Sequence, residues 1–463
     1  MIYRAEIRDV ATRQFSCTCP DFRINGLGTC KDVEGILLLL ERRHRAEFKA
    51  AGRGSSGRAD IVPAADGLRV ERNADRLPDR RRPPAHAPHP AATTVPLGPH
   101  VIEWNLTPAT DFPSRAALWD AINDLGSGSA LLQARFVTLL LRFFGHGRMR
   151  LGIATDAGTP VAMSLIEPAR PLVWTSIQPA QAPLGLWLTT PDLDHGQAAR
   201  ALLRSLPGSV LLLGLQQQDP RVSSRPRPGP GLRTLDYIHT ARISADGTFE
   251  DYWTRRGKNL RHNLRRQLNR LEREGIQPRL EVTTRPEAMA AAVADYGRLE
   301  SAGWKTRTGT AVAADNVQGA FYRALLKTYA QTGDALVYRF FYNERLVAID
   351  LCIHGSGTLN WLKTTYDETQ TTSSPAALLR QASFRLAFAD ARIAAIEFYG
   401  PVMDWHTKWA EDFRTMYHIN CYRWPWLAPL HEHQQHIRQA LTRRAAQPPC
   451  PPCPTGGGSQ CAY

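Results

Sequence analysis

The stretch that decides the fold runs from Thr358 to Gly400 and reads TLNWLKTTYDETQTTSSPAALLRQASFRLAFADARIAAIEFYG. Its beginning, 358–366, is rich in Thr, Trp and Tyr and predicts a β-strand. Residues 376–391 have the apolar period of a helix, and residues 393–400 predict a second, buried strand. A loop that leads from a strand into a helix is where an open sheet holds a phosphate-bearing ligand, because backbone amides point out of the first helical turn. The stretch therefore predicts an α/β fold with an anion site between strand and helix.

The residues before this stretch predict helices followed by hairpin-linked strands. The expected helices are 286–300 and 317–331, and the expected strands, separated by Asn343–Glu344, are 335–342 and 346–353. Further upstream, residues 101–247 show a similar succession of strand, strand, strand, helix and strand. This similarity of pattern favours two tandem domains of similar plan over a short-period repeat.

Four segments resemble a known family in their order along the chain. They are FEDYWTRRGKNLRHNLRRQLNRLEREG (249–275), AGWKTRTGTAV (302–312), RLVAIDLCIHGSGTLNWLKTTYDETQTTSSPAALL (345–379) and IEFYGPVMDWHTKWA (396–410). Together they resemble the CelD/FemAB-like branch of the GNAT N-acyltransferases, with a likeness that extends over residues 101–423. The resemblance implies an α/β (α+β) fold of tandem GNAT-like domains, with mixed sheets flanked by helices. The first, degenerate domain would occupy 101–247 and the acyltransferase domain 248–445.

Acyl transfer from a CoA thioester needs a place for the diphosphate of the donor, acetyl-CoA or another acyl-CoA. The loop before the expected helix offers one, because Pro fits the first helical turn and the amides that follow point toward a phosphate. The candidate donor-binding residues are Ser373, Ser374, Pro375, Ala376, Ala377 and Arg380, the last as a partner for a phosphate oxygen. Relatives usually have glycine where Ala376 stands, and its methyl group restricts close approach. A capped helix without a ligand is the alternative.

Two side chains on the expected strands are candidates for proton transfer. Tyr366 ends the third strand, where strand ends face the cleft, and its phenol can donate a proton to the departing sulfur. Asp350 lies in an apolar strand, and a buried carboxylate needs a partner. It could act as the base for the incoming amine, whose pKa of about 10.4 keeps it protonated at neutral pH. A structural salt bridge, to Lys363 for example, is the alternative.

The resemblance also marks residues for an acceptor, an amine-bearing small molecule or a glycan precursor of the cell envelope or of an exopolysaccharide. Trp304 and Lys305 stand where the family places a tryptophan beside the acceptor cleft, and Asp404 and Lys408 match its late helix. Lys363 lies near the end of the same strand as Tyr366. A core aromatic residue and solvated lysines are the plainer interpretation.

Residues 1–48 contain a cysteine cluster that resembles a SWIM-type zinc module, whose pattern is CxC followed by CxH. Cys17 and Cys19 would lie on one face of a hairpin strand while Cys30 and Asp32 open a helix, which gives four ligands from two elements. Asp32 stands where the pattern has histidine, and its oxygen is a harder ligand for zinc. A zinc site and a vestigial finger with free thiols both remain open. The usual role of such a module is contact with nucleic acid or protein.

The chain has 463 residues, of which 43% are hydrophobic and 22% charged. This composition is that of an ordinary globular protein. Residues 49–100 and 446–463 are rich in Pro and Gly and predict a disordered basic linker and a disordered tail. The net charge of +14 favours anionic partners, and the Arg-rich helix within 255–273 could hold nucleotide-sugar phosphates, tRNA or an anionic lipid surface. No apolar run is long enough to span a membrane and the N-terminus lacks a signal peptide, so we expect a cytoplasmic protein.

The sequence thus predicts a bacterial N-acyltransferase that uses an acyl-CoA. Two alternatives stay open. One is FemAB-like aminoacyl transfer from charged tRNA. The other is a non-catalytic nucleic-acid-binding protein in which the finger, the linker and the basic helix contact phosphate.

Overall fold

The computed structural model describes residues 102–301 and 316–433, together with the backbone of four short strands nearer the N-terminus. The chain divides into two compact units, Met1–Val95 and Pro96–Tyr463. In the first unit, β1 (Ala5–Asp9) pairs antiparallel with β2 (Gln14–Cys17), and β3 (Ala59–Ala64) pairs antiparallel with β4 (Gly67–Arg72). The second hairpin lies inside the segment expected to be a linker. Its strands read ADIVPA and GLRVER, and their apolar β-branched residues favour pairing that the average composition of the segment conceals.

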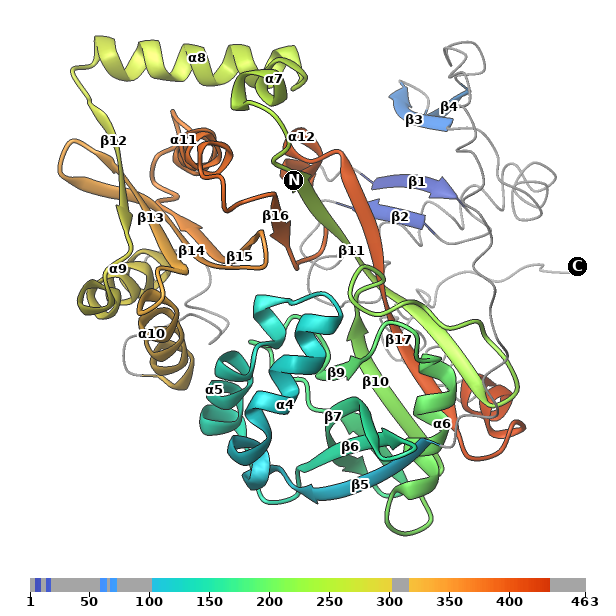
Figure 1. Cartoon of the computed structure of the whole chain (residues 1–463). Helices are drawn as coiled ribbons and strands as arrows, with labels where there is room; N and C mark the ends of the chain where they lie inside the picture. The colour runs from blue at the N-terminus through green and yellow to red at the C-terminus, as the bar shows by residue number, and fades with distance from the viewer. Residues whose placement is uncertain are drawn as a thin grey trace, which may run out of the picture. The chain divides into compact units, whose positions relative to one another are not determined.

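Within the described part of the second unit, thirteen strands form one mixed sheet (Figure 1). The chain builds the sheet in two halves of similar order. The first half contributes β5 (Ile102–Pro108), β6 (Arg150–Asp156), β7 (Thr159–Arg170), β8 (Val173–Ser176), β9 (Trp187–Thr189), β10 (Leu212–Gln218) and β11 (Leu232–Ser244). The second half contributes β12 (Pro278–Thr283), β13 (Ala335–Tyr342), β14 (Arg345–Gly355), β15 (Thr358–Tyr366), β16 (Ala395–Phe398) and β17 (Asp412–Tyr422).

Helices cover both faces of this sheet. They are α4 (Phe112–Leu125), α5 (Ala134–Phe144), α6 (His195–Ser205), α7 (Phe249–Thr254), α8 (Lys258–Arg273), α9 (Met289–Ser301), α10 (Val317–Ala330), α11 (Pro375–Ala389) and α12 (Asp404–Trp409). Ile349 and Leu351 of β14 share a core with α4, α5, α9 and α10, whereas Ala348 and Cys352 share a second core with α7, α8 and α11. Because side chains alternate along a strand, these two groups of helices lie on opposite faces of β14. A third core joins α6 to β10 and β17.

Most of the elements expected from the sequence are confirmed. β13 and β15 have the expected bounds, and the break at Asn343 is a turn in which this residue takes a positive φ of 51°. The expected first-half order of a hairpin, a strand, a helix and a strand is also present, as β6, β7, β8, α6 and β10. The edge strands β5 and β12 were not expected. Each has many exposed positions, so neither shows the apolar run of a buried strand.

The two halves exchange their last strands. β11, from the first half, lies between β16 and β17, and β17, from the second half, pairs antiparallel with β10. Each half of the sheet is therefore completed by a strand of the other half. The expected boundary between residues 247 and 248 falls in a loop, but the sheet continues across both halves.

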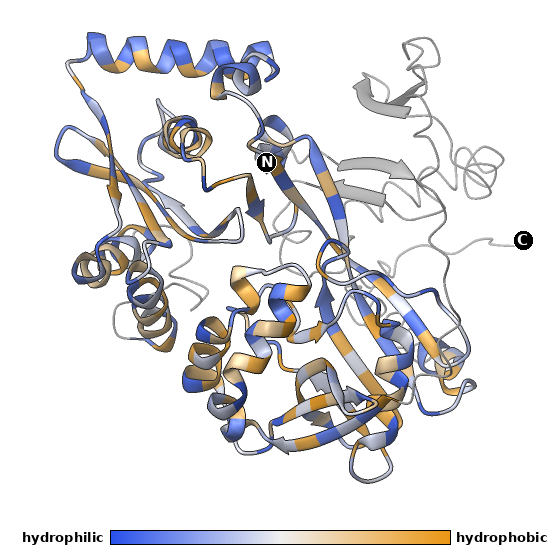
Figure 2. Cartoon of the chain, in the orientation of Figure 1, coloured by the Kyte–Doolittle hydropathy of each residue, from blue (hydrophilic) through white to orange (hydrophobic). Residues whose placement is uncertain are grey.

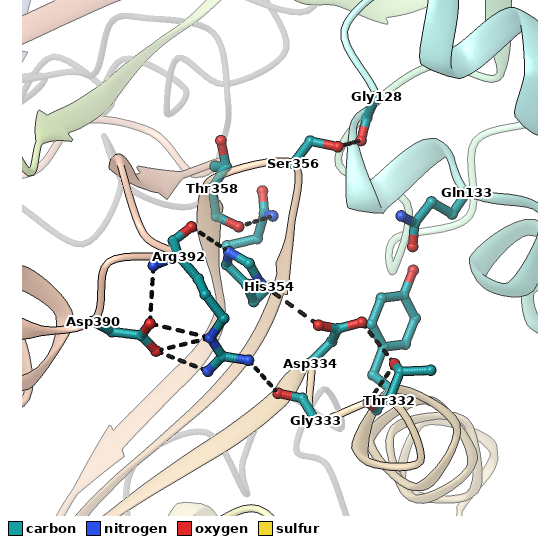
Figure 3. A network of polar contacts seen from close by, with 12 residues as sticks. Gly128, Gln133, Thr332, Gly333, Asp334, His354, Ser356, Thr358, Asp390 and Arg392 are labelled. Atoms are coloured by element: carbon teal, nitrogen blue, oxygen red, sulfur yellow. Dashed lines mark hydrogen bonds and ion pairs between the residues drawn. The ribbon is translucent and has the colours of Figure 1, made fainter.

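Polar contacts join the halves at a second place, and Figure 3 shows those around His354 and Ser356 from close by. Arg135 of α5 donates from Nη2 to Asp334 Oδ2 at 2.8 Å, and Ser356 donates from Oγ to the Gly128 carbonyl at 2.6 Å. His354 lies between them, with its Nδ1 3.6 Å from Asp334 Oδ1. These contacts fix α5 and the loop after α4 against the ends of β13 and β14. Among the described residues, no helix is both long and apolar enough to cross a membrane.

Candidate functional site

The candidate site begins where β15 and β16 part. These neighbours are parallel, but their pairing covers only Thr358–Asn360 against Ala395–Glu397. β15 continues beyond this pairing through Trp361–Tyr366. Since open sheets bind ligands outside the carboxyl ends of their parallel strands, the side chains around this end of β15 are candidates for binding and chemistry.

β15 also contains one extra residue in the segment beyond the pairing. Trp361 pairs with Cys352 and Lys363 pairs with Leu351, so Leu362 has no partner in the register with β14. A β-bulge of this kind bends the strand and leaves a residue out of the hydrogen-bond ladder, and bulges are common next to active sites.

Asp350, in the middle of β14, is 1% exposed, and neither of its carboxylate oxygens has a hydrogen-bond partner among the described residues. Burial raises the pKa of this carboxyl to about 6, and the neighbouring Arg380 opposes the rise. Thr364 and Trp361 oppose it as well, although neither reaches hydrogen-bond geometry with the carboxylate. The carboxyl is thus close to a guanidinium and out of contact with solvent.

Arg380 of α11 was expected at a phosphate oxygen. Its side chain is 6% exposed and packs against α12 and β15. Its guanidinium lies 3.7 Å from the centre of the Trp405 ring, and its Nη2 donates to Thr364 Oγ1 at 3.4 Å. Burial lowers the pKa of Arg380, while Asp350 and Tyr366 oppose the change. The guanidinium of Arg380 is therefore buried near Asp350, and Tyr366 is near enough to influence its pKa.

The two candidates on β15, Tyr366 and Lys363, differ in their surroundings. Tyr366, the last residue of the strand, is 46% exposed and so is open to a ligand. Lys363 is partly buried, and its Nζ lies 5.7 Å from the centre of the Tyr322 ring of α10. Lys363 pairs with Leu351, the residue after Asp350, and its side chain points toward α10. Because successive side chains of a strand point to opposite faces, Asp350 faces away from Lys363, and the cation that affects its pKa is Arg380.

The loop before α11 stands where the sequence places it, and the helix begins at Pro375 as expected. Ser373 Oγ accepts a hydrogen bond from the Tyr342 hydroxyl at 3.0 Å. The Ser374 amide donates to Gln267 Oε1 of α8 at 2.7 Å, and the Ala377 amide donates to the Ser374 carbonyl at 2.9 Å. Pro375 has no amide hydrogen. Of the amides after Pro375 that were expected to meet a phosphate, that of Ala377 is therefore engaged within the helix, and the Ser374 amide before the proline is engaged by a side chain.

The short helix α12 brings both exposed and buried groups to the site. Asp404 and Lys408 are exposed on it. His406 is buried, and its ring stacks on that of Trp405 with centroids 3.5 Å apart. Burial and then the charge of Arg380 lower the pKa of His406 to about 4, so this imidazole is neutral at physiological pH. Asp404 and Lys408 are thus available to a ligand, whereas His406 and Trp405 support Arg380.

A buried ionic cluster lies at the centre of the sheet, near the exchanged strands. Arg414 of β17 donates from Nε to Asp219 Oδ1 at 2.7 Å and from Nη2 to Glu397 Oε2 at 2.9 Å. Arg242 of β11 lies 3.1 Å from the other oxygen of Glu397. Burial raises the pKa of Glu397 to about 7, and the charge of Arg414 opposes the rise. Because both carboxylates are paired with arginines, the cluster holds the two halves together.

The first half has a cavity of about 410 Å³ beside β8 and β10, which pair in parallel as β15 and β16 do. Its lining includes Thr175, Gly214, His418 and Asn420. Burial lowers the pKa of His418 to about 4, and its Nδ1 accepts a hydrogen bond from the Gln217 amide at 2.9 Å. The cavity is therefore lined by both apolar and hydrogen-bonding groups, with Arg170 as a cation in its wall.

Several sequence-predicted site residues lie outside the described residues. They are Trp304, Lys305, Cys19, Cys30, Asp32 and the side chain of Cys17, which ends β2. Within the ranges that the structure describes, no group of three or more His, Cys, Asp or Glu side chains is arranged to hold a metal ion. The zinc module and the acceptor role of Trp304 and Lys305 remain predictions.

Residues 258–407 match a family model described as an acetyltransferase (GNAT) domain. The matched segment contains α8, the split of β15 from β16 and most of α12. No curated protein matches the sequence of the chain.

Solved structures that resemble this chain include L-PGS from Bacillus licheniformis, with 15% identity and a TM-score of 0.42 over 66% of this chain and 91% of that chain. FemX has 9% identity and a TM-score of 0.46 over 68% of this chain and 97% of its own. A tandem GNAT protein from the clavulanic acid biosynthesis pathway has 13% identity and a TM-score of 0.36, with 68% and 98% covered.

Three residues next to the candidates were missed by the sequence analysis. Gln267 engages the Ser374 amide, Thr364 contacts Arg380, and Trp405 stacks on Arg380. Trp405 lies inside the motif VMDWHTKWA, so the motif itself contained the signal. Gln267 and Thr364 also lie in quoted segments, but their roles depend on contacts between elements far apart in the sequence, which those segments do not specify.

Proposed function

We propose that this protein is an N-acyltransferase that moves an acyl group from an acyl-CoA, in the first instance acetyl-CoA, to an amine. The proposed acceptor is an amine-bearing small molecule or a glycan precursor of the cell envelope or of an exopolysaccharide. One observation carries the proposal. Inside the segment that matches the GNAT domain, β15 leaves its parallel neighbour after Asn360 and ends at an exposed tyrosine beside a buried guanidinium.

In the proposed reaction, the acceptor amine attacks the thioester carbonyl, the carbon–sulfur bond breaks, and the leaving thiolate takes a proton. Tyr366 is the proposed donor of that proton, because its phenol is exposed at the strand end. The neighbouring Arg380 stabilises the phenolate that remains, since an opposite charge close by favours the ionised form. The proton lost by the amine then restores the phenol through solvent.

Asp350 has a different part in this proposal from the one that its sequence position suggests. Because it is 1% exposed, it cannot take a proton from an amine without a movement of the strands. We assign it instead to hold Arg380, whose charge influences its pKa, against Trp405. Asp350 is in this scheme a positioning residue, and Tyr366 is the catalytic one.

The proposed donor site is the start of α11, from Ser373 to Ala377. A diphosphate that used the Ser374 amide would have to displace Gln267, which now accepts from it. Lys408, Asp404 and Lys363 are the proposed contacts for the acceptor or for donor phosphates. The engaged amide at Ser374 and the methyl of Ala376 also favour the alternative donor, an aminoacyl-tRNA, since both leave less room for the diphosphate of CoA.

A direct test combines binding with thiol release. We expect acetyl-CoA to raise the thermal midpoint of the protein, and free thiol to appear when a panel of amines is added. Tyr366→Phe should lower kcat by a factor of about 10² or more with little change in KM. Tyr237→Phe is the matched control, because Tyr237 is 43% exposed and lies in the first half.

The outcome can reject the donor or the whole proposal. Stabilisation by aminoacyl-tRNA with none by any acyl-CoA would replace the thioester donor with a charged tRNA. Absence of stabilisation by both, with no thiol release, would refute the transferase assignment and leave the non-catalytic alternative.

A further inference from the structure

We propose that the exposed face of α8 binds the sugar-phosphate backbone of a nucleic acid. The proposal does not depend on acyl transfer, because it concerns binding on the outside of the helix.

The inner face of α8 holds the helix firmly on the protein. Leu264 and Leu271 are buried in the core that contains α11, and Leu260 and Leu268 pack against the same core. Gln267 adds the hydrogen bond to the Ser374 amide. The outer face is therefore held in a fixed orientation by the inner one.

The outer face is strongly cationic. α8 contains six arginine or lysine residues and one glutamate, which gives a net charge of +5. Lys258, Arg265 and Arg266 are exposed, and within the described ranges none of them has an ion pair or a side-chain hydrogen bond. Arg270 pairs with Glu274 at 2.6 Å, an exposed contact that a ligand can replace at little cost. Several cations of α8 are thus free to meet an anion.

The length of this cationic face fits a polymer better than a small donor. Lys258 and Arg273 are separated along the helix axis by about 22 Å, at about 1.5 Å per residue. One strand of a nucleic acid presents a phosphate about every 3.4 Å of helix axis, so the face spans about six phosphates. The few phosphates of an acyl-CoA would meet only one end of it.

The composition of the outer face favours a nucleic acid over a membrane. The exposed side chains between the cations are polar, among them Asn259, His262, Asn263 and Asn269, and the leucines are turned inward. Figure 2 shows α8 mainly in the hydrophilic colour, broken by short hydrophobic bands. A helix that lies in a membrane surface needs an apolar face free to enter the lipid, which α8 lacks. Asparagine and arginine side chains are common partners of phosphate and sugar.

The test measures binding of a fluorescent single-stranded RNA of 20 nucleotides to the full chain between 50 and 200 mM salt, with no acyl donor present. The α8 variant carries Lys258→Gln, Arg265→Gln and Arg266→Gln, which keep good helix formers. The control variant removes the same charge elsewhere through Arg115→Gln, Arg204→Gln and Arg227→Gln, at exposed positions. Equal thermal midpoints of the three proteins establish that both variants fold.

Loss of three phosphate contacts should lower the slope of log K against log salt by about 2, since each contact contributes about 0.7 for a single strand. We expect this in the α8 variant and a clearly smaller change in the control. Equal losses in both variants, or an unchanged α8 variant, would overturn the proposal. Equally strong competition by polyglutamate of matched charge would also overturn it, because the face would then suit an acidic protein. A failure of acyl transfer leaves these outcomes unaffected, so the two proposals fail separately.

Discussion

Replacing Asp350 by asparagine tests whether its carboxyl is uncharged over part of the physiological range. Burial raises the pKa of Asp350 to about 6, against about 3.9 for an unfolded chain. Between these two values the native protein keeps a proton that the unfolded chain has released, so stability falls as pH rises through this window. The difference of about 2 pH units corresponds to about 3 kcal/mol.

The assay is urea unfolding of wild type and of Asp350→Asn from pH 4 to pH 7.5. The variant lacks the titration, so its free energy of unfolding relative to wild type should rise by up to about 3 kcal/mol between pH 4 and pH 6.5 and then stay level. The cost of leaving Arg380 without its carboxylate is a constant offset that cancels in this comparison. A difference that does not change with pH would refute the reasoning. A difference that falls with pH would show that the attraction to Arg380 outweighs burial.

Asp367→Asn is a matched control with the opposite sign. Burial tends to raise the pKa of Asp367, but hydrogen bonds from Thr369 and Gln370 and the charge of Arg345 outweigh it and hold the pKa low. The ionised carboxylate of Asp367 therefore stabilises the protein above the pKa of an unfolded aspartate, and this stabilisation is lost as pH falls. The variant lacks it, so its free energy of unfolding should fall relative to that of wild type as pH rises through about 4. The contrast separates the environment of Asp350 from any general effect of removing a carboxylate.

Three further expectations concern contacts between elements. Gln267→Ala should free the Ser374 amide and tighten binding of acetyl-CoA by about fivefold in calorimetry, since about 1 kcal/mol of hydrogen bonding no longer competes. Weaker binding would remove this amide from the donor site. Arg414→Met should cost about 3–5 kcal/mol in urea unfolding, because it leaves the buried Asp219 without its cation and Glu397 with Arg242 alone. Arg298→Met, at a surface ion pair, should cost less than about 1 kcal/mol, and similar losses would contradict the buried network. Tyr329→Phe should cost about 1–3 kcal/mol by the same measurement, because the Ala130 carbonyl of the other half loses its hydroxyl donor and keeps only the Gln133 amide at 3.4 Å. An unchanged midpoint would argue against that link.

Local patterns were enough to predict most elements of the fold. The alternation and turn residues around Asn343 fixed the bounds of β13, and Ser374–Pro375 marked the start of α11. The pairing of β10 with β17 could not be predicted from local patterns. Leu215 and Ile419, for example, face each other in this pairing but lie about 200 positions apart in the sequence. Nothing in either strand alone specifies its neighbour.

The candidate site was predictable in its members but not in its geometry. Asp350 was singled out because a carboxylate in an apolar strand is unusual, and Tyr366 because it ends a strand. Arg380 was assigned to a phosphate, but the structure gives it a buried place on Trp405. The direction of a side chain one turn into a helix depends on what packs against that helix, and the sequence of α11 does not contain this information.

The exchange of β11 and β17 has a consequence for synthesis of the protein on the ribosome. The first half emerges from the ribosome well before β17 is synthesised. Until then, the edge of β10 that pairs with β17 in the native sheet has no partner. Exposed edges of this kind invite pairing with other nascent chains. Slow elongation between Ser244 and Asp412, or a stop codon placed between the halves, should therefore yield chains that need a chaperone to stay in solution.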